Sequence, residues 1–387
     1  MKSRCLMLSI ALLLLLTPSV PACPFCSAQG KTLLGEVTQA HMILFGTMTN
    51  AKRDPDSFDK GSTDLQIEVV VKDHAVLAGR KTLTLDRYIP PDAKTKFLVF
   101  CEVFNGKIDP YRGMPVAFNS TIGEYLKGAI DIKDKAPATR LNFFFKYLDA
   151  TDFDVSNDAL IEFANSDYEA FRAVAKTLPA DKIATWLNDP ETPPSRFGLY
   201  GSMLGHSGKP EHAEILRKLL VDPKKKFLSG MDGVLAGYTM LQPKEGWQFI
   251  CDVIKDQKRE FLYRYAAVRA ARFFYEFRPD VVSKDDVVKG LLPMLAQPDM
   301  ADFPIDDFRK WGRFDLSETI VPMYQLGTHQ TSIVKRAIIR YALSCPTTDL
   351  RAMSFLEDVR ADNAEHVRDV EELLWLEQTP VPTPTKK

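Results

Sequence analysis

The sequence predicts a multidomain protein of the β + α class, in which a small five-stranded β-barrel precedes an all-α helical solenoid. Two observations carry this prediction. Apolar residues recur at every second position before about residue 135, and with the helical period of 3.6 beyond it. Helix-ending sequences then recur every 33 or 34 residues, which is typical of stacked helix pairs. At 387 residues, the chain is long enough for two or three domains.

The composition is that of a globular protein, and its net charge does not indicate a strongly charged partner. Charged residues make up 26% and hydrophobic residues 45% of the chain, and 50 basic side chains face 51 acidic ones. Since there is no basic excess to neutralise phosphates, nucleic acid is not expected as a partner.

Residues 1–22 have the pattern of a secretory signal peptide. Lys2 and Arg4 precede the apolar run Leu6 to Leu16, and the expected cleavage point follows at Ala22. The run is shorter than the roughly 20 residues of a membrane span, and no later segment approaches that length without charges. We therefore expect a secreted or periplasmic protein without a transmembrane helix.

Cleavage after Ala22 would make Cys23 the first residue, which raises the alternative of a lipid anchor on this cysteine. Val20 and Pro21 depart from the lipid-attachment pattern, which prefers Leu and a small residue at these two places. Free secretion is therefore favoured, and a lipid anchor at Cys23 stays an alternative.

Cys23 and Cys26 form a C-x-x-C pair, which can be a redox dithiol, half of a zinc site or two halves of structural disulfides. A redox pair needs a preceding strand, and zinc needs a second ligand pair that the sequence does not offer. Structural disulfides are favoured, with Cys101 as the natural third participant. No metal or cofactor is expected. Cys251 and Cys345 lie on apolar helix faces and are expected to be inert buried thiols.

Five strands are expected in the N-terminal third. Alternating apolar residues predict strands at 40–49 and 64–72, and further strands are expected at 81–85, 96–103 and, after the Asn105-Gly106 turn, 107–111. Short helices are expected at 29–39 and 122–126. This pattern predicts a small, closed or partly open barrel over residues 23–130.

Several features of this segment carry a resemblance to a known family. They are the cysteine pair, Phe45-Gly46 at a strand, Leu77-Ala78-Gly79 between two strands and the hydrophobic strand at 97–100. Together they resemble a netrin-like module, the OB-like barrel shared with tissue inhibitors of metalloproteinases. The resemblance covers residues 23–130, and it implies inhibition of a secreted metalloprotease as one alternative function.

Helices are expected over residues 141–378, after a polar linker at 131–140. Ser332 to Ala342 has the apolar pattern of an amphipathic helix, and Lys209-Pro210-Glu211 begins another with proline in its first turn. Helix ends are expected at Leu187-Asn188-Asp189-Pro190, at Leu220-Val221-Asp222-Pro223, at Ile254-Lys255-Asp256 and, displaced by a longer unit, at Leu295-Ala296-Gln297-Pro298.

These units resemble degenerate HEAT-like repeats, and residues 196–208 are the best match to the helix-turn-helix of that family. Residues 299–330 depart from the repeat as an insertion or a strongly degenerate unit. Their acidic residues Asp302, Asp306 and Asp307 lack a calcium-loop pattern and predict a solvated acidic loop. The Pro/Thr tail at 379–387 is expected to be extended and disordered.

No serine-hydrolase elbow, zincin or nucleotide-binding motif occurs in the sequence, so an enzyme is not expected. The helix at 261–277 is instead dense in aromatic and arginine residues, the types that dominate binding hot spots. The candidate binding-surface residues are Tyr263, Arg264, Arg269, Arg272, Tyr275 and Trp311.

With its signal, the chain resembles secreted bacterial proteins that join a netrin-like module to HEAT-like helices. The sequence thus predicts a non-enzymatic extracytoplasmic interaction or scaffold protein, whose solenoid binds another protein or a surface polymer. The alternatives are a thiol-disulfide redox protein that uses Cys23 and Cys26, and a netrin-like inhibitor of a secreted metalloprotease.

Overall fold

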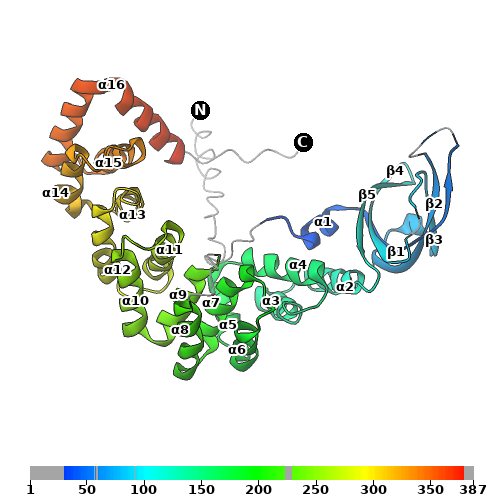
Figure 1. Ribbon diagram of the computed structural model, residues 1–387. Coiled ribbons are helices and arrows are strands. Elements are labelled where there is room, and N and C mark those ends of the chain that lie inside the picture. Colours follow the sequence, from blue (N-terminus) through cyan, green and yellow to red (C-terminus); the bar gives the residue numbers. More distant parts are fainter. Residues whose placement is uncertain (1–29, 56, 58–59, 91, 223–228, 379–387) are drawn as a thin grey trace, which may run out of the picture. The chain divides into compact units, whose positions relative to one another are not determined.

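The chain folds into two compact units, Met1–Leu178 and Pro179–Lys387, named here the sheet unit and the helical unit. The computed structural model describes residues 30–55, 57, 60–90, 92–222 and 229–378 (Figure 1). The predicted signal peptide, Cys23, Cys26 and the tail at 379–387 lie outside the described residues.

A five-stranded antiparallel sheet forms the first half of the sheet unit (Figure 1). Its strands are β1 (Met42–Arg53), β2 (Gly61–Lys72), β3 (Thr82–Leu85), β4 (Thr95–Phe104) and β5 (Lys107–Ala117). They pair in the order β3-β2-β1-β4-β5. All five strands expected from the sequence are confirmed. The period-two pattern places Met42, Leu44, Leu65 and Val99 in one buried cluster.

The sheet is not closed, so of the two expected forms, a closed or a partly open barrel, the closed one is wrong. Within the described residues, β3 and β5 are the two edges and do not pair with each other. The sequence of these strands gives the physical reason. β3 has only 4 residues, and β5 carries Pro110 and Pro115, whose nitrogens have no hydrogen to donate to a neighbouring strand.

Five helices complete the sheet unit: α1 (Leu33–Gln39), α2 (Ile122–Ile132), α3 (Pro137–Phe145), α4 (Phe153–Ala164) and α5 (Tyr168–Ala175). The expected linker at 131–140 therefore contains the end of α2 and the beginning of α3. The division between the units falls at Leu178 instead. The buried carboxylate of Asp158 on α4 explains this. It accepts hydrogen bonds from the backbone N–H of Leu33 at 2.6 Å and from Tyr125 Oη on α2 at 2.9 Å, so these helices belong with the sheet.

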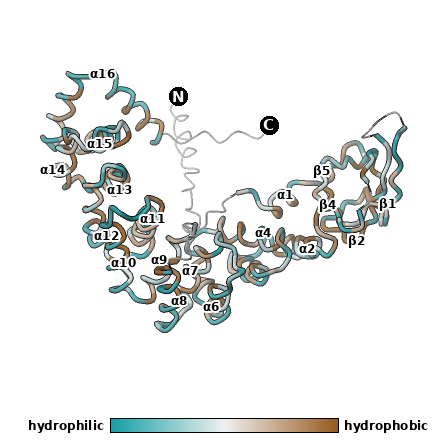
Figure 2. Tube along the Cα trace, in the orientation of Figure 1, coloured by the Kyte–Doolittle hydropathy of each residue, from teal (hydrophilic) through white to brown (hydrophobic). Residues whose placement is uncertain are grey.

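The helical unit contains α6 (Ala180–Asn188), α7 (Phe197–Ser207), α8 (Ala213–Val221), α9 (Met231–Leu241), α10 (Pro243–Lys255), α11 (Phe261–Phe277), α12 (Lys284–Leu291), α13 (Asp302–Lys310), α14 (Ser317–Ile320), α15 (Ser332–Ser344) and α16 (Leu350–Gln378). Helices pack on their near neighbours in the chain: α7 on α9, α9 on α11, α13 on α15 and α15 on α16. Figure 2 shows apolar residues recurring along these helices between hydrophilic ones, as an array buried on one face requires.

The expected helix ends agree closely with the structure. α6 ends at Asn188, α8 at Val221 and α10 at Lys255, and a short 3-10 helix, η4 (Leu292–Ala296), ends at the fourth expected position. Residues 196–208 differ from the expectation, because they form a single helix, α7, and not a helix-turn-helix.

Residues 299–330 also differ from the expectation, since they contain α13 and α14 and not an acidic loop. The side chain of Asp307 explains the difference. It lies on the inner face of α13 and is buried against Arg272 of α11, so this acidic segment is held by an ion pair.

Glycines bring α7 and α9 into close contact. A Cβ atom added to Gly201 would lie 2.8 Å from Val234 Cα, and one added to Gly205 would lie 2.6 Å from Gly237 Cα. From the other side, a Cβ on Gly237 would overlap the carbonyl oxygen of Gly201. The two backbones therefore pack at a separation that side chains larger than hydrogen at these positions would not allow.

We expect Gly237→Ala to destabilise the helical unit by about 1–3 kcal/mol, the usual cost of overpacking, even though alanine favours helix by about 1 kcal/mol. Chemical denaturation would measure the change. The matched control is Gly327→Ala, because an added Cβ there has no atom within 4 Å. Equal stability of the two variants would contradict the close packing of α7 on α9.

Asp158 should give the sheet unit an unusual pH dependence. Burial raises the pKa of Asp158 from 3.8 to about 6, so the folded state holds this proton more tightly than the unfolded state. Its contribution is therefore most favourable below pH 4 and is lost as the pH rises to about 6, a loss of about 3 kcal/mol. Denaturation of wild type and Asp158→Asn at several pH values would measure this.

The Asp158→Asn variant should gain stability relative to wild type between pH 4 and pH 7, since the amide does not ionise. The matched control is Asp131→Asn, at an exposed position of α2. A stability difference between wild type and Asp158→Asn that stays constant with pH would show that this carboxyl group does not titrate as described.

Candidate functional site

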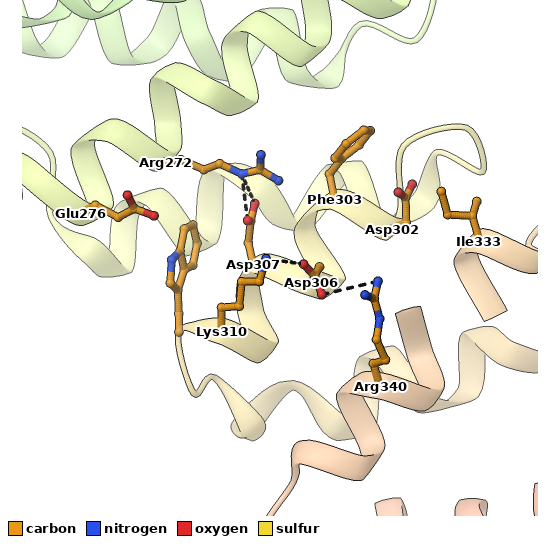
Figure 3. Close-up of a pocket in the computed structure, with 10 residues that line it drawn as sticks. Arg272, Glu276, Asp302, Phe303, Asp306, Asp307, Lys310, Ile333 and Arg340 are labelled. Atoms are coloured by element: carbon orange, nitrogen blue, oxygen red, sulfur yellow. Dashed lines mark hydrogen bonds and ion pairs between the residues drawn. The ribbon is translucent and has the colours of Figure 1, made fainter. Parts of the chain in front are cut away.

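An open pocket of about 560 Å³ lies between α11, α13 and α15 of the helical unit (Figure 3). This volume falls within the range of roughly 300–1,000 Å³ that is usual for ligand sites in proteins. Three basic residues line it: Arg272, Lys310 and Arg340. Four acidic residues line it: Glu276, Asp302, Asp306 and Asp307. Three apolar residues complete the lining: Phe303, Trp311 and Ile333.

Helical spacing brings these side chains to the same pocket. Arg272 and Glu276 are four residues apart on α11, and Asp306 and Lys310 are four apart on α13, so each pair shares one helix face. Ile333 and Arg340 are two turns apart on α15 and share a face in the same way. Each of the three helices therefore turns one stripe of its surface toward the pocket.

The Arg272–Asp307 pair forms the floor of the site and joins α11 to α13 (Figure 3). Arg272 Nε lies 2.8 Å from one carboxylate oxygen of Asp307 and 2.9 Å from the other. Burial raises the pKa of Asp307, and the facing Arg272 opposes that rise. Since the carboxylate is buried, the charge of Arg272 is committed to it.

The other two basic side chains of the lining are committed to Asp306. Lys310 Nζ lies 2.8 Å from its carboxylate and an Arg340 nitrogen lies 3.6 Å from it, while Arg309 approaches it to 2.9 Å. Burial alone would raise the pKa of Asp306, but these cations hold it below its usual value. Each of the three basic residues of the lining therefore faces a carboxylate of the protein, and Lys310 and Arg340 share that of Asp306.

Glu276 and Asp302 are the two acidic residues of the lining that have no basic partner within the described part of the chain. Glu276 lies near the end of α11, and Asp302 begins α13. Desolvation raises the pKa of both carboxyl groups, and the nearby positive charges of Arg272 and of Lys310 or Arg340 offset this only in part. With four acidic and three basic side chains, the ionised lining has an excess of one negative charge.

Aromatic contacts fix the apolar walls. Trp311 stacks on Tyr275 with ring centroids 3.7 Å apart and planes at 12°. The ring centroids of Phe303 and Tyr265 lie 4.9 Å apart, and the guanidinium carbon of Arg272 lies 5.8 Å from the Phe303 ring centroid. Because these rings already pack within the protein, the walls need little ordering when an occupant binds.

Of the six binding-surface residues predicted from the sequence, the structure brings Arg272 and Trp311 into the pocket, with Tyr275 buried directly behind Trp311. The other three contact neighbouring helices and loops. Arg264 is only 5% exposed and binds Asp299 at 2.5 Å and Gln297 at 2.7 Å.

Tyr263 Oη donates to the carbonyl of Leu220 at 2.8 Å, and Arg269 pairs with the buried carboxylate of Asp232 on α9 at 2.8 Å. The sequence did not single out for binding the other eight lining residues: Glu276, Asp302, Phe303, Asp306, Asp307, Lys310, Ile333 and Arg340. Glu276 follows Arg272 by one helical turn, so the sequence alone could have placed it on the same face of α11 as Arg272. Ile333 and Arg340 of α15 reach the pocket through the packing of α15 on α13, which no local sequence pattern predicts.

Cys101 lies fully buried in the core of the sheet and forms no disulfide with a described cysteine. Burial raises its pKa to about 12, and likewise raises the pKa of Cys251 to about 11 and of Cys345 to about 12. These thiols stay protonated at neutral pH and are poor nucleophiles. Cys23 and Cys26 lie outside the described residues. Among the residues described, no three His, Cys, Asp or Glu side chains are placed to hold a metal ion.

In the described part of the chain, every helix is too short or too polar to cross a membrane. Comparison of the sequence with family models and with curated proteins, and of the fold with solved structures, gave no match. The case for function therefore depends on the geometry and charge of the pocket.

We expect Arg272→Met to destabilise the helical unit by about 2–4 kcal/mol, because it leaves the Asp307 carboxylate buried without its partner. Arg272→Met/Asp307→Leu should recover most of this loss, since neither charge is then buried. Denaturant titrations of the two variants would test the pair. A double variant no more stable than Arg272→Met would contradict the structural role assigned to it.

Proposed function

We propose that this chain is an extracytoplasmic interaction protein whose helical unit binds another polypeptide in the pocket between α11, α13 and α15. The observation that carries the proposal is the lining itself, which combines packed aromatic walls with fixed charges in an open pocket of about 560 Å³. Its ten residues include no serine, cysteine or histidine, so the lining offers no nucleophile of these types and no imidazole base. Recognition is the function that such a lining supports best.

The proposed occupant is a polypeptide and not a surface polymer. Aromatic and arginine side chains, which carry most of the energy of protein–protein hot spots, lie at this pocket in Arg272 and Trp311. Ile333 is 57% exposed at its edge and adds apolar surface that an aliphatic or aromatic side chain would cover.

The proposal includes the two modules and the location expected from the sequence. A netrin-like assignment of the sheet unit is supported by five antiparallel strands in the order β3-β2-β1-β4-β5. A HEAT-like assignment of the helical unit is supported by helices that pack on their near neighbours and end at the repeat positions. The signal pattern at residues 1–22 supports export, with lipid attachment at Cys23 as the alternative mode.

A peptide-binding experiment tests the proposal. We expect random peptides displayed on phage to yield ligands for the full chain, and Ile333→Arg to weaken them about tenfold or more, since the long charged side chain covers the edge of the pocket. Fluorescence anisotropy with the selected peptides would measure affinity.

The matched control is Leu350→Arg, because Leu350 is 80% exposed and lies outside the pocket lining. Both substitutions place arginine at an exposed position, so neither should unfold the protein. Peptides that lose affinity equally in the two variants, or in neither, would show that this pocket is not the binding site.

A further inference from the structure

We infer that the pocket between α11, α13 and α15 takes a basic polypeptide segment, whose lysine or arginine side chains pair with Glu276 and Asp302. The inference rests on the proposed function and specifies the chemistry of the partner.

The charges of the lining favour a basic occupant. Arg272 is paired with Asp307, and Lys310 and Arg340 are paired with Asp306. Glu276 and Asp302 alone remain as unpaired charges among the residues that form the pocket. A cationic occupant completes this set, whereas an anionic occupant would add to an existing negative charge.

An anion would be costly to accommodate beside Arg272. A carboxylate or phosphate could bind Arg272 only by taking it from Asp307, and it would share Lys310 and Arg340 with Asp306. Asp307 is only 5% exposed, so losing Arg272 would leave its charge buried without a partner. Breaking such a pair costs several kcal/mol, and an anion would have to supply that energy before gaining any affinity from Arg272. A basic side chain displaces no existing pair.

The two unpaired acids are also placed to receive a cation. Figure 3 shows Glu276 and Asp302 on opposite sides of the Arg272–Asp307 pair. Desolvation disfavours the ionised form of both carboxyl groups, and a cation placed beside them would relieve this cost. Phe303 and Trp311 line the same pocket, where they can cover the alkyl stem of a lysine or the plane of an arginine.

Three short peptides of equal length serve as probes of the full chain: alternating lysine and leucine, alternating glutamate and leucine, and alternating glutamine and leucine, all with blocked ends. Binding is measured by calorimetry at fixed ionic strength, because ion pairing with a partly exposed site weakens as salt rises. We expect the lysine peptide to bind most tightly and the glutamate peptide least.

Charge-neutral variants locate the effect. We expect Glu276→Gln and Asp302→Asn each to weaken the lysine peptide about fivefold, the effect of losing one partly exposed ion pair, and to leave the glutamine peptide unchanged. The matched control is Glu245→Gln, which removes one exposed acidic charge on α10, away from the lining. It should not change the affinity of the lysine peptide.

The outcomes separate this inference from the proposed function. If the glutamate or glutamine peptide binds as tightly as the lysine peptide, and Ile333→Arg weakens it, the pocket binds polypeptide but the charge inference is wrong. An equal response of Glu245→Gln and Glu276→Gln also overturns the inference, since it indicates attraction by the whole surface. If Ile333→Arg weakens none of the three peptides, the inference and the proposed function both fail.

Discussion

The close contact between α7 and α9 is the constraint from which the rest of the helical unit is built. Gly201 and Gly205 of α7 face Gly237 of α9, so the two backbones touch without intervening side chains. α11 packs on α9, and its Arg269 pairs with the buried Asp232 of α9. α13 is joined to α11 by the pair between Arg272 and Asp307. The position of the pocket thus depends on successive helix contacts, from the glycine contact of α7 with α9, through α9 with α11, to α11 with α13.

In both units, buried carboxylates connect neighbouring helices. Asp158 joins α1, α2 and α4 in the sheet unit, Asp232 joins α9 to α11, and Asp307 joins α11 to α13. A buried carboxylate is costly unless its partners are correctly placed, so each of these groups favours one arrangement of its helices over alternatives. At the pocket, Arg272 is held by the buried Asp307, whereas Glu276 and Asp302 have no such partner and could pair with an occupant.

Local patterns in the sequence were sufficient for the elements but not for their assembly. Local strand and turn patterns located all five strands, and the Asp-Pro and Lys-Asp positions located the ends of α6, α8 and α10, because these signals depend only on neighbouring residues. The open sheet, the helical nature of α13 and the division at Leu178 depend on long-range contacts, among them Asp307 with Arg272 and Asp158 with Tyr125. The aromatic and arginine content of α11 pointed to a helix that borders the pocket, yet it did not separate Arg272, which lines the pocket, from Arg264, which is buried in packing.

The central claim is that a polypeptide binds where α11, α13 and α15 meet. Amide hydrogen exchange of the full chain, with and without the lysine–leucine peptide, tests it most directly because it reports where binding orders the backbone. The account predicts slower exchange at residues 302–310 and 332–344 and in the second half of α11, with the sheet unit unchanged. Protection confined to the sheet unit, or to helices α6 to α9, would contradict it.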